Sequence, residues 1–98
     1  MFLLIISYQL NQKINMELVY DLEGKFLYRN LEMPSEDLPI TILSVINQCY
    51  IGYVISDFVN LQDWGENIQY EILLKGTSKG LEIIIDEAGM VLCECDED

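Results

Sequence analysis

The stretch of residues 68–92 constrains the fold more than any other part of the sequence. Ile68, Tyr70, Ile72 and Leu74 alternate with other residues at the two-residue period of a strand that has one buried face. The rest of the stretch is predicted to form, in order, turn 75–80, strand 81–85, turn 86–89 and strand 90–93. Gly89 stands where a positive φ is expected. The pattern therefore predicts three strands joined by two tight turns.

The first third of the chain has the same pattern. Its predicted elements are strand 2–10, turn 11–13, strand 14–20, turn 21–24 and strand 25–31. Aligning Asp21 with Asp86 places Gly24 on Gly89 and Phe26 on Val91, which favours an internal repeat. The alternative is that any two hairpins with Asp-x-x-Gly turns look alike.

Residues 35–49 contain the best helix candidate, with Ser35 or Asp37 as the N-cap and Pro39 within the first turn. Its apolar stripe is predicted to be Leu38, Ile42, Val45 and Cys49, with Ile46 beside them. We therefore expect Cys49 to be buried. Residues 53–60 are predicted to form one strand, and residues 62–67 a polar loop.

The composition excludes several classes of function. The 98 residues, 51% of them hydrophobic, suit one small domain. A formal net charge of −12 argues against nucleic acid and anionic membranes and fits a basic or mixed protein surface, although acidity also simply maintains solubility. The absence of histidine removes the Ser-His and Cys-His nucleophile arrangements. We predict no enzyme, no catalytic residue and no cofactor.

The two ends of the chain offer little chemistry. Residues 1–6 are apolar but too short to span a bilayer, and they lack the basic region and cleavage site of a signal peptide. Cys93 and Cys95 lie on one side of a strand, so a soft metal or a redox pair is imaginable, yet the zinc spacing rules are not met. We predict no metal site, and a solvated acidic tail at residues 96–98.

The order of elements resembles the PepSY-like family of small secreted bacterial proteins, which share the fold of the β-lactamase-inhibitor protein. The matching positions are Leu38-Pro39, Tyr50, Gly52-Tyr53, Tyr70-Glu71, and Asp86 with Gly89. The resemblance implies an α+β fold, an antiparallel sheet of six or seven strands with one helix on one face, in the order βββ-α-ββββ. It also implies a single domain over residues 1–98, with a partial strand repeat at 1–33 and a full repeat at 34–98.

The same resemblance implies a periplasmic or secreted protein that binds or inhibits another protein, and it carries over no catalytic residues. Three departures stand out: the signal peptide is absent, the first repeat lacks its own helix, and Ile51 stands where the family has proline. If the chain is complete as given, a cytoplasmic location is expected instead.

Trp64, the single tryptophan, is the best candidate for a binding residue. Together with Asp63 and Glu66 it is predicted to form an exposed anchor for a basic or mixed partner surface. The alternative is that Trp64 folds back over the sheet edge as a lid. Tyr70 is expected in the core instead, since it alternates with the apolar residues of its strand.

Two function classes follow from these observations. The first is an exported binding or inhibitor-like module. The second is a structural or self-assembling subunit, in the form of a homodimer or a fragment of a longer two-repeat protein. Self-association is expected through strand 2–10, because it carries few charges that would block edge pairing.

Overall fold

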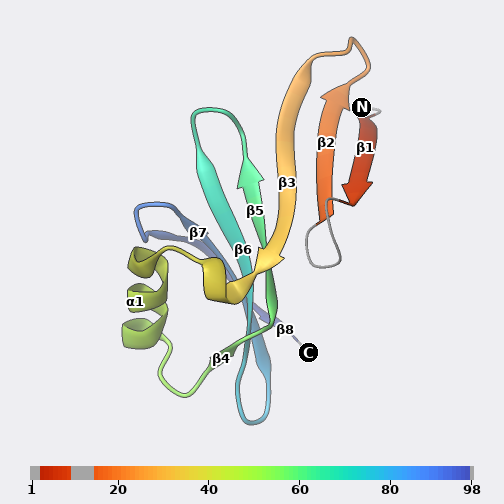
Figure 1. Ribbon diagram of the computed structural model, residues 1–98. Coiled ribbons are helices and arrows are strands. Elements are labelled where there is room, and N and C mark those ends of the chain that lie inside the picture. Colours follow the sequence, from red (N-terminus) through yellow and green to blue (C-terminus); the bar gives the residue numbers. More distant parts are fainter. Residues whose placement is uncertain (1–2, 10–14, 98) are drawn as a thin grey trace.

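The computed structural model describes residues 3–9 and 15–97, and these form one antiparallel sheet with an α-helix against part of it (Figure 1). The elements are β1 (Leu3–Gln9), β2 (Asn15–Asp21), β3 (Phe26–Pro34), a 3₁₀ turn η1 (Ser35–Asp37), α1 (Ile40–Cys49), β4 (Val54–Ile55), β5 (Phe58–Asp63), β6 (Ile68–Lys75), β7 (Gly80–Asp86) and β8 (Val91–Glu97). The α+β class, the single sheet and the position of the helix are confirmed. The predicted turn at 11–13 lies outside the described residues.

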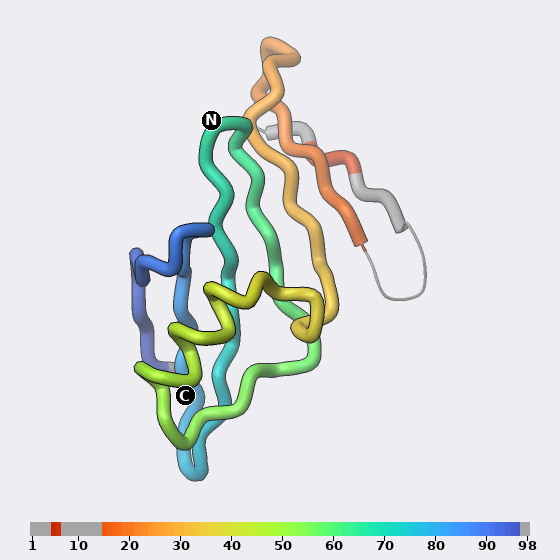
Figure 2. Tube along the Cα trace, turned by 60° about the vertical axis from the view of Figure 1, so that its left-hand side comes forward, coloured from red at the N-terminus to blue at the C-terminus, as the bar shows by residue number. Residues whose placement is uncertain are grey.

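Neighbouring strands follow the order β1-β2-β3-β5-β6-β7-β8, and the short β4 pairs with β6. Every pairing is antiparallel. Short turns explain this for β2–β3, β5–β6, β6–β7 and β7–β8, whereas β3 and β5 are connected through α1. Figures 1 and 2 show α1 beside β6, β7 and β8, whereas β1 and β2 lie away from it at the far side of the sheet. A single helix therefore covers only part of one face.

The core lies between α1 and the strands closest to it. Tyr70, Ile72 and Leu74 on β6 are buried, which confirms the predicted alternation of this strand. The buried residues that pack with them are Leu38, Ile42, Ile46, Val59, Leu81, Ile83 and Ile85. Burial of this apolar cluster supplies the main driving force for folding.

The helix begins later than predicted, at Ile40, and neither Ser35 nor Asp37 caps it. Its N-cap is Pro39, with no side-chain hydrogen bond. A proline disfavours the helical conformation of the residue before it, and Leu38 is extended with φ −61 and ψ 144. Residues 35–37 are therefore separated from α1 and form η1.

The prediction that Cys49 is buried is wrong, because its side chain is exposed. Leu38, Ile42 and Ile46 follow one another at spacings of four residues, and that row continues to the partly buried Tyr50. Cys49 stands one position off this row, on the solvent side of the helix.

The single strand predicted at 53–60 is also wrong, since β4 and β5 are separate. Ser35 N donates to Asp57 O at 2.9 Å, and Ser56 Oγ donates to Phe58 O at 3.2 Å. These bonds hold the break at residues 56–57. On either side of the break, β4 and β5 pair with successive parts of β6, and β5 also pairs with β3. The predicted solvated tail is part of β8 at Asp96 and Glu97, which pair with Leu81 and Gly80, and Asp96 is exposed as predicted.

The two Asp-x-x-Gly turns have the same hydrogen bonds. Asp21 Oδ1 accepts from the N–H groups of residues 23 and 25, both at 2.9 Å. Asp86 Oδ1 accepts from those of residues 88 and 90, at 3.0 and 2.9 Å. Gly24 and Gly89 both have positive φ, 83 and 92, and a register shift lies next to each turn. This agreement supports the proposed internal repeat.

Candidate functional site

The side of the sheet that points away from α1 is built from residues that alternate with the core. Gln69, Glu71 and Leu73 lie between the buried residues of β6 and therefore point the other way. We call this side the open face, because α1, the one α-helix among the described residues, lies on the opposite side (Figure 2). Its polar residues include Asn15, Glu17, Asn30, Glu32, Asn60, Gln62, Gln69, Glu71, Glu82 and Asp86.

Polar side chains form rows across the open face. Glu17, Asn30, Gln62 and Gln69 are aligned in register on β2, β3, β5 and β6. Asn30 Nδ2 donates to Glu17 Oε1 at 3.3 Å, and Gln69 Nε2 donates to Gln62 Oε1 at 2.8 Å. Asn30 Oδ1 is buried and has no hydrogen-bond partner. The row therefore orients its amides before any partner arrives and keeps one acceptor unused.

Two carboxylates stand close together in the next part of the open face. Burial and the charge of the nearby Glu82 raise the pKa of Glu71. Glu71 and Glu82 line a hollow of about 220 Å³ together with Phe58 and Asn60. Among the described residues the one ion pair is on the other side of the sheet, so these two carboxylates are not neutralised by a basic partner.

Aromatic side chains flank the polar centre. Phe58, 43% exposed, lies at one end, and Tyr28 and Trp64 lie at the other. The rings of Tyr28 and Trp64 are stacked, with centroids 4.3 Å apart and planes at 27°. Trp64 is 47% exposed, so it packs against the sheet on one side and meets solvent on the other. The stack on Tyr28 corresponds to the lid alternative, and the role of Trp64 as an anchor stays a prediction.

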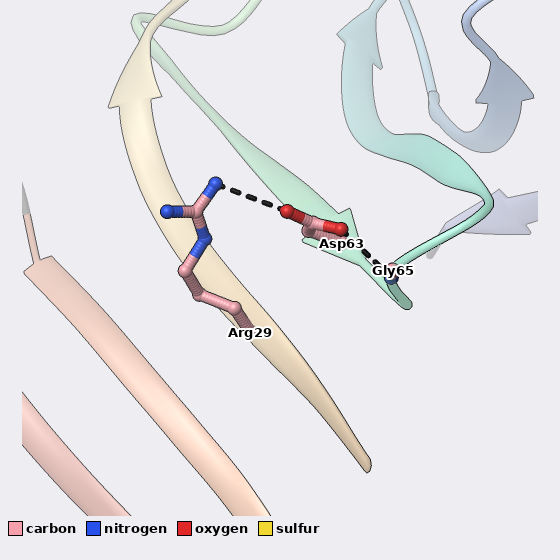
Figure 3. A network of polar contacts seen from close by, with 3 residues as sticks. All are labelled: Arg29, Asp63 and Gly65. Carbon is pink, nitrogen blue, oxygen red and sulfur yellow. Dashed lines mark hydrogen bonds and ion pairs between the residues drawn. The ribbon is translucent and has the colours of Figure 1, made fainter. Parts of the chain in front are cut away.

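Asp63, which was predicted to bind a partner together with Trp64, connects β3 to the turn after β5 through its carboxylate. Its Oδ2 accepts from Arg29 Nη2 at 3.1 Å, and its Oδ1 accepts from Gly65 N at 2.8 Å (Figure 3). These bonds fix the turn that carries Trp64. Glu66, in the same turn, is exposed and forms none of the described hydrogen bonds.

The sequence did not single out Tyr28, Phe58 or Val19. Val19 is only 2% exposed and pairs in register with Ile5 on β1 and with Tyr28 on β3. Its burial shows that the open face also has a small apolar region beside the Tyr28–Trp64 stack. The alternation within β2 and β3 indicates which residues share a face of the sheet. That Tyr28 lies next to Trp64 follows only from the register between β3 and β5.

A further polar contact joins the end of α1 to β8 on the helix side. Tyr50 Oη donates to Glu94 Oε2 at 3.0 Å. Burial, this hydrogen bond and the charge of Glu94 raise the pKa of Tyr50 to about 12. Cys93 and Cys95 are both exposed on β8, paired with Ile84 and Glu82. In the described part of the chain, no three His, Cys, Asp or Glu side chains are grouped as metal ligands.

Comparison with known proteins identifies the fold. No family model matches the sequence, and no curated protein matches it. Solved structures from Bacteroides do match. A DUF2874 family protein from Bacteroides ovatus has a TM-score of 0.74 and 11% identity, over 94% of this chain and 74% of that one. A BLIP-like protein from Bacteroides fragilis has a TM-score of 0.73 and 19% identity, over 94% of this chain and 73% of that one.

A third similar structure, from Bacteroides eggerthii, has a TM-score of 0.76 and 10% identity, over 94% of this chain and 76% of that one. That protein is described by the words "putative periplasmic proteins". The chain thus has the fold of DUF2874 and BLIP-like proteins, and at these identities the likeness concerns the fold alone. Within residues 3–9 and 15–97, no helix has the length and apolar character needed to cross a bilayer.

Proposed function

We propose that this chain is a non-enzymatic, inhibitor-like binding module that holds a basic or mixed protein surface against its open face. The observation that carries the proposal is the composition of that face: polar and acidic rows in the centre and large exposed aromatics at both ends. Aromatic residues dominate the energy of protein interfaces, and charge complementarity guides association. The BLIP-like description of the Bacteroides fragilis protein supports the same class of function.

The carboxylates of the open face indicate that the partner surface carries positive charge. Glu71 and Glu82 repel one another in the free chain, and a cationic side chain placed between them removes that repulsion. The net charge of −12 acts in the same direction at longer range. Within this face Trp64 is the proposed anchor, Glu66 lies beside it, and Asp63 acts by positioning the turn.

A binding experiment with matched variants tests the proposal. The chain carries a photo-cross-linker at Leu73, the cross-linked protein from a bacterial periplasmic extract is identified by mass spectrometry, and its Kd is then measured with purified components. We expect the double variant Glu71→Gln, Glu82→Gln to bind about tenfold more weakly while remaining folded. Asp96→Asn, which removes a charge from the helix side of the sheet, should change the Kd less than about twofold.

The result that overturns the proposal is equally concrete. If Asp96→Asn weakens binding as much as the double variant does, the loss comes from overall charge. If the double variant binds like the wild type, the open face is not the contact. Urea unfolding of the double variant is the control: a midpoint at or above that of the wild type means that a loss of affinity does not come from unfolding.

Self-assembly is a second candidate, favoured by the two edges of the sheet. β8, at one edge, carries Glu94, Asp96 and Glu97, which discourage pairing with another strand. β1, at the other edge, reads LLIISYQ and carries no charge. We propose that β1 pairs antiparallel with β1 of a second copy, which forms a homodimer and leaves both open faces accessible.

Family and location complete the proposal. We propose that residues 1–98 form one PepSY-like domain with a partial repeat at 1–33 and a full repeat at 34–98, supported by the matching hydrogen bonds of the Asp21 and Asp86 turns.

We propose a periplasmic or secreted location, supported by the description of the Bacteroides eggerthii protein. Fractionation of the native host, with detection by antibody, tests the location.

A further inference from the structure

A cleft of about 620 Å³ lies at one end of the sheet, between the β5–β6 turn and the β7–β8 turn. Figure 1 shows that the β5–β6 hairpin reaches further than the neighbouring β7–β8 turn, which leaves a step between them. Glu87 N donates to Ile68 O at 3.2 Å and ties the lower turn to the hairpin. The β7–β8 turn that bounds the cleft is therefore bonded to the first residue of β6.

The aromatic wall of the cleft is held in place before any partner binds. Trp64 lines it, and the ring is supported by the stack with Tyr28, 4.3 Å away. Trp64 N also donates to Asn67 O at 2.9 Å, and Asp63 fixes Gly65 next to it. A ring that is already ordered loses little entropy on binding, which raises the affinity it can provide.

The rest of the lining is divided between apolar and acidic groups. Ile68 and Leu92 give the cleft apolar surface, and Glu87 gives it an exposed carboxylate. Asp86 also lines the cleft, but its Oδ1 is already bonded within its turn. None of the described residues that line the cleft is basic. The cleft therefore favours a ligand that is cationic and apolar in adjacent parts.

We propose that this cleft receives an arginine side chain and a neighbouring apolar residue from a partner protein. The guanidinium group stacks on Trp64 and pairs with the carboxylate of Glu87, which suits its planar, delocalised charge. The apolar neighbour packs on Ile68 and Leu92. The inference rests on the proposed function and deepens it, because it names the part of the partner that reaches beyond the open face.

The single tryptophan of the chain reports directly on this site. The emission of Trp64 is followed while the capped peptide Leu-Arg-Leu-Arg is added, and the capped peptides Leu-Gln-Leu-Gln and Leu-Glu-Leu-Glu serve as controls. We expect the arginine peptide to change the emission with a Kd at least about fivefold lower than that of the glutamine peptide. The glutamate peptide should give no response, and added salt should weaken the arginine response.

Variants locate the contact. Glu87→Gln should weaken binding of the arginine peptide about fivefold, because it removes the carboxylate of the cleft. Ala88→Arg, which places a cation in the exposed turn that lines the cleft, should abolish it. Glu23→Gln is the matched control, since Glu23 is an exposed acid in the equivalent Asp21 turn and does not line the cleft. It should leave the Kd unchanged.

Three results overturn the inference: equal responses to the arginine and glutamine peptides, no response at millimolar peptide, or an effect of Glu23→Gln as large as that of Glu87→Gln. Failure of the cleft is distinguishable from failure of the proposed function. A partner that loses affinity with Glu71→Gln, Glu82→Gln but is indifferent to Ala88→Arg binds the open face without using the cleft. A partner indifferent to both sets of variants contradicts the two proposals together.

Discussion

Trp64 combines a packing contact within the chain with a surface that is exposed to solvent. Half of its surface is exposed, so its contribution to stability comes from the stack with Tyr28 and from partial burial. We predict that Trp64→Ala lowers the free energy of unfolding by about 1–2 kcal/mol, measured by urea denaturation. A loss above about 3 kcal/mol would indicate a core residue and contradict its role as a binding anchor. Tyr28→Ala is the matched variant on the other side of the stack.

Glu71 is a residue that costs the free chain stability at neutral pH. Its pKa in the folded chain is raised, so the folded state binds more protons than the unfolded state between the two pKa values. The free energy of unfolding therefore falls as pH rises through that window and is regained as pH falls. Such a cost at an exposed face is what a surface kept for binding would show.

The corresponding prediction concerns Glu71→Gln. At pH 7 the variant should unfold at higher urea concentration than the wild type, with a gain of a few tenths to about 1 kcal/mol, because repulsion from Glu82 is removed. The difference should shrink as pH falls through the raised pKa of Glu71, because the wild-type carboxyl is then protonated. A variant that is less stable than the wild type at pH 7 would mean that the Glu71 carboxylate has a stabilising partner.

At the scale of elements, the two Asp-x-x-Gly turns are equivalent in bonding but not in surroundings. A Cβ at Gly89 would lie 3.0 Å from Val45 Cγ2 of α1, whereas one at Gly24 would meet nothing within 4 Å. Both glycines have positive φ, so alanine costs about 1 kcal/mol at either position. The second turn thus packs against α1 at Gly89, whereas Gly24 of the first turn has no neighbour at the same distance.

We therefore predict that Gly89→Ala destabilises the chain by at least about 1 kcal/mol more than Gly24→Ala does, because α1 must shift to make room. Urea unfolding of the two variants measures this difference, and Gly24→Ala is the control for backbone strain alone. Equal losses would show that α1 does not pack tightly on the second turn.

The sequence could predict those features that residues close in the chain determine, and it could not predict those that depend on contacts between distant strands. The alternation from Ile68 to Leu74 reports burial directly, so this strand and the fold class could be predicted. The start of α1 could not be predicted. The apolar pattern Leu38, Ile42, Ile46 continues across Pro39, whereas the helical backbone begins only at Ile40. The Tyr28–Trp64 stack depends on the pairing of β3 with β5, which no pattern within either strand reveals.

At the scale of the whole molecule, the sheet is longer than the helix that covers it. The chain extends 44 Å along its longest axis and 28 Å along the others, and α1 lies at the end formed by β6, β7 and β8 (Figure 1). β1 forms a free edge at the other end. The molecule therefore offers two surfaces for contact, the open face and the uncharged edge.

The edge can be tested separately from the face. Ile5, 52% exposed on β1, is replaced by lysine, and light scattering coupled to size-exclusion chromatography gives the mass over a range of concentrations. We expect the wild type to dimerise and Ile5→Lys to be monomeric, because a charge on an edge strand opposes pairing. Met90→Lys, in an exposed turn, should dimerise like the wild type. A wild type that is monomeric at every concentration contradicts the dimer.

The most direct test of the binding face is amide NMR of the ¹⁵N-labelled chain during titration with the captured, purified partner. The open-face proposal predicts that the largest shifts lie at Asn60, Gln62, Glu71 and Glu82, and that they extend to Trp64. Residues of α1 and the outer side chains near Asp96 should shift little. Shifts concentrated on α1 and on the helix side of β8, with the open face unchanged, would contradict the account.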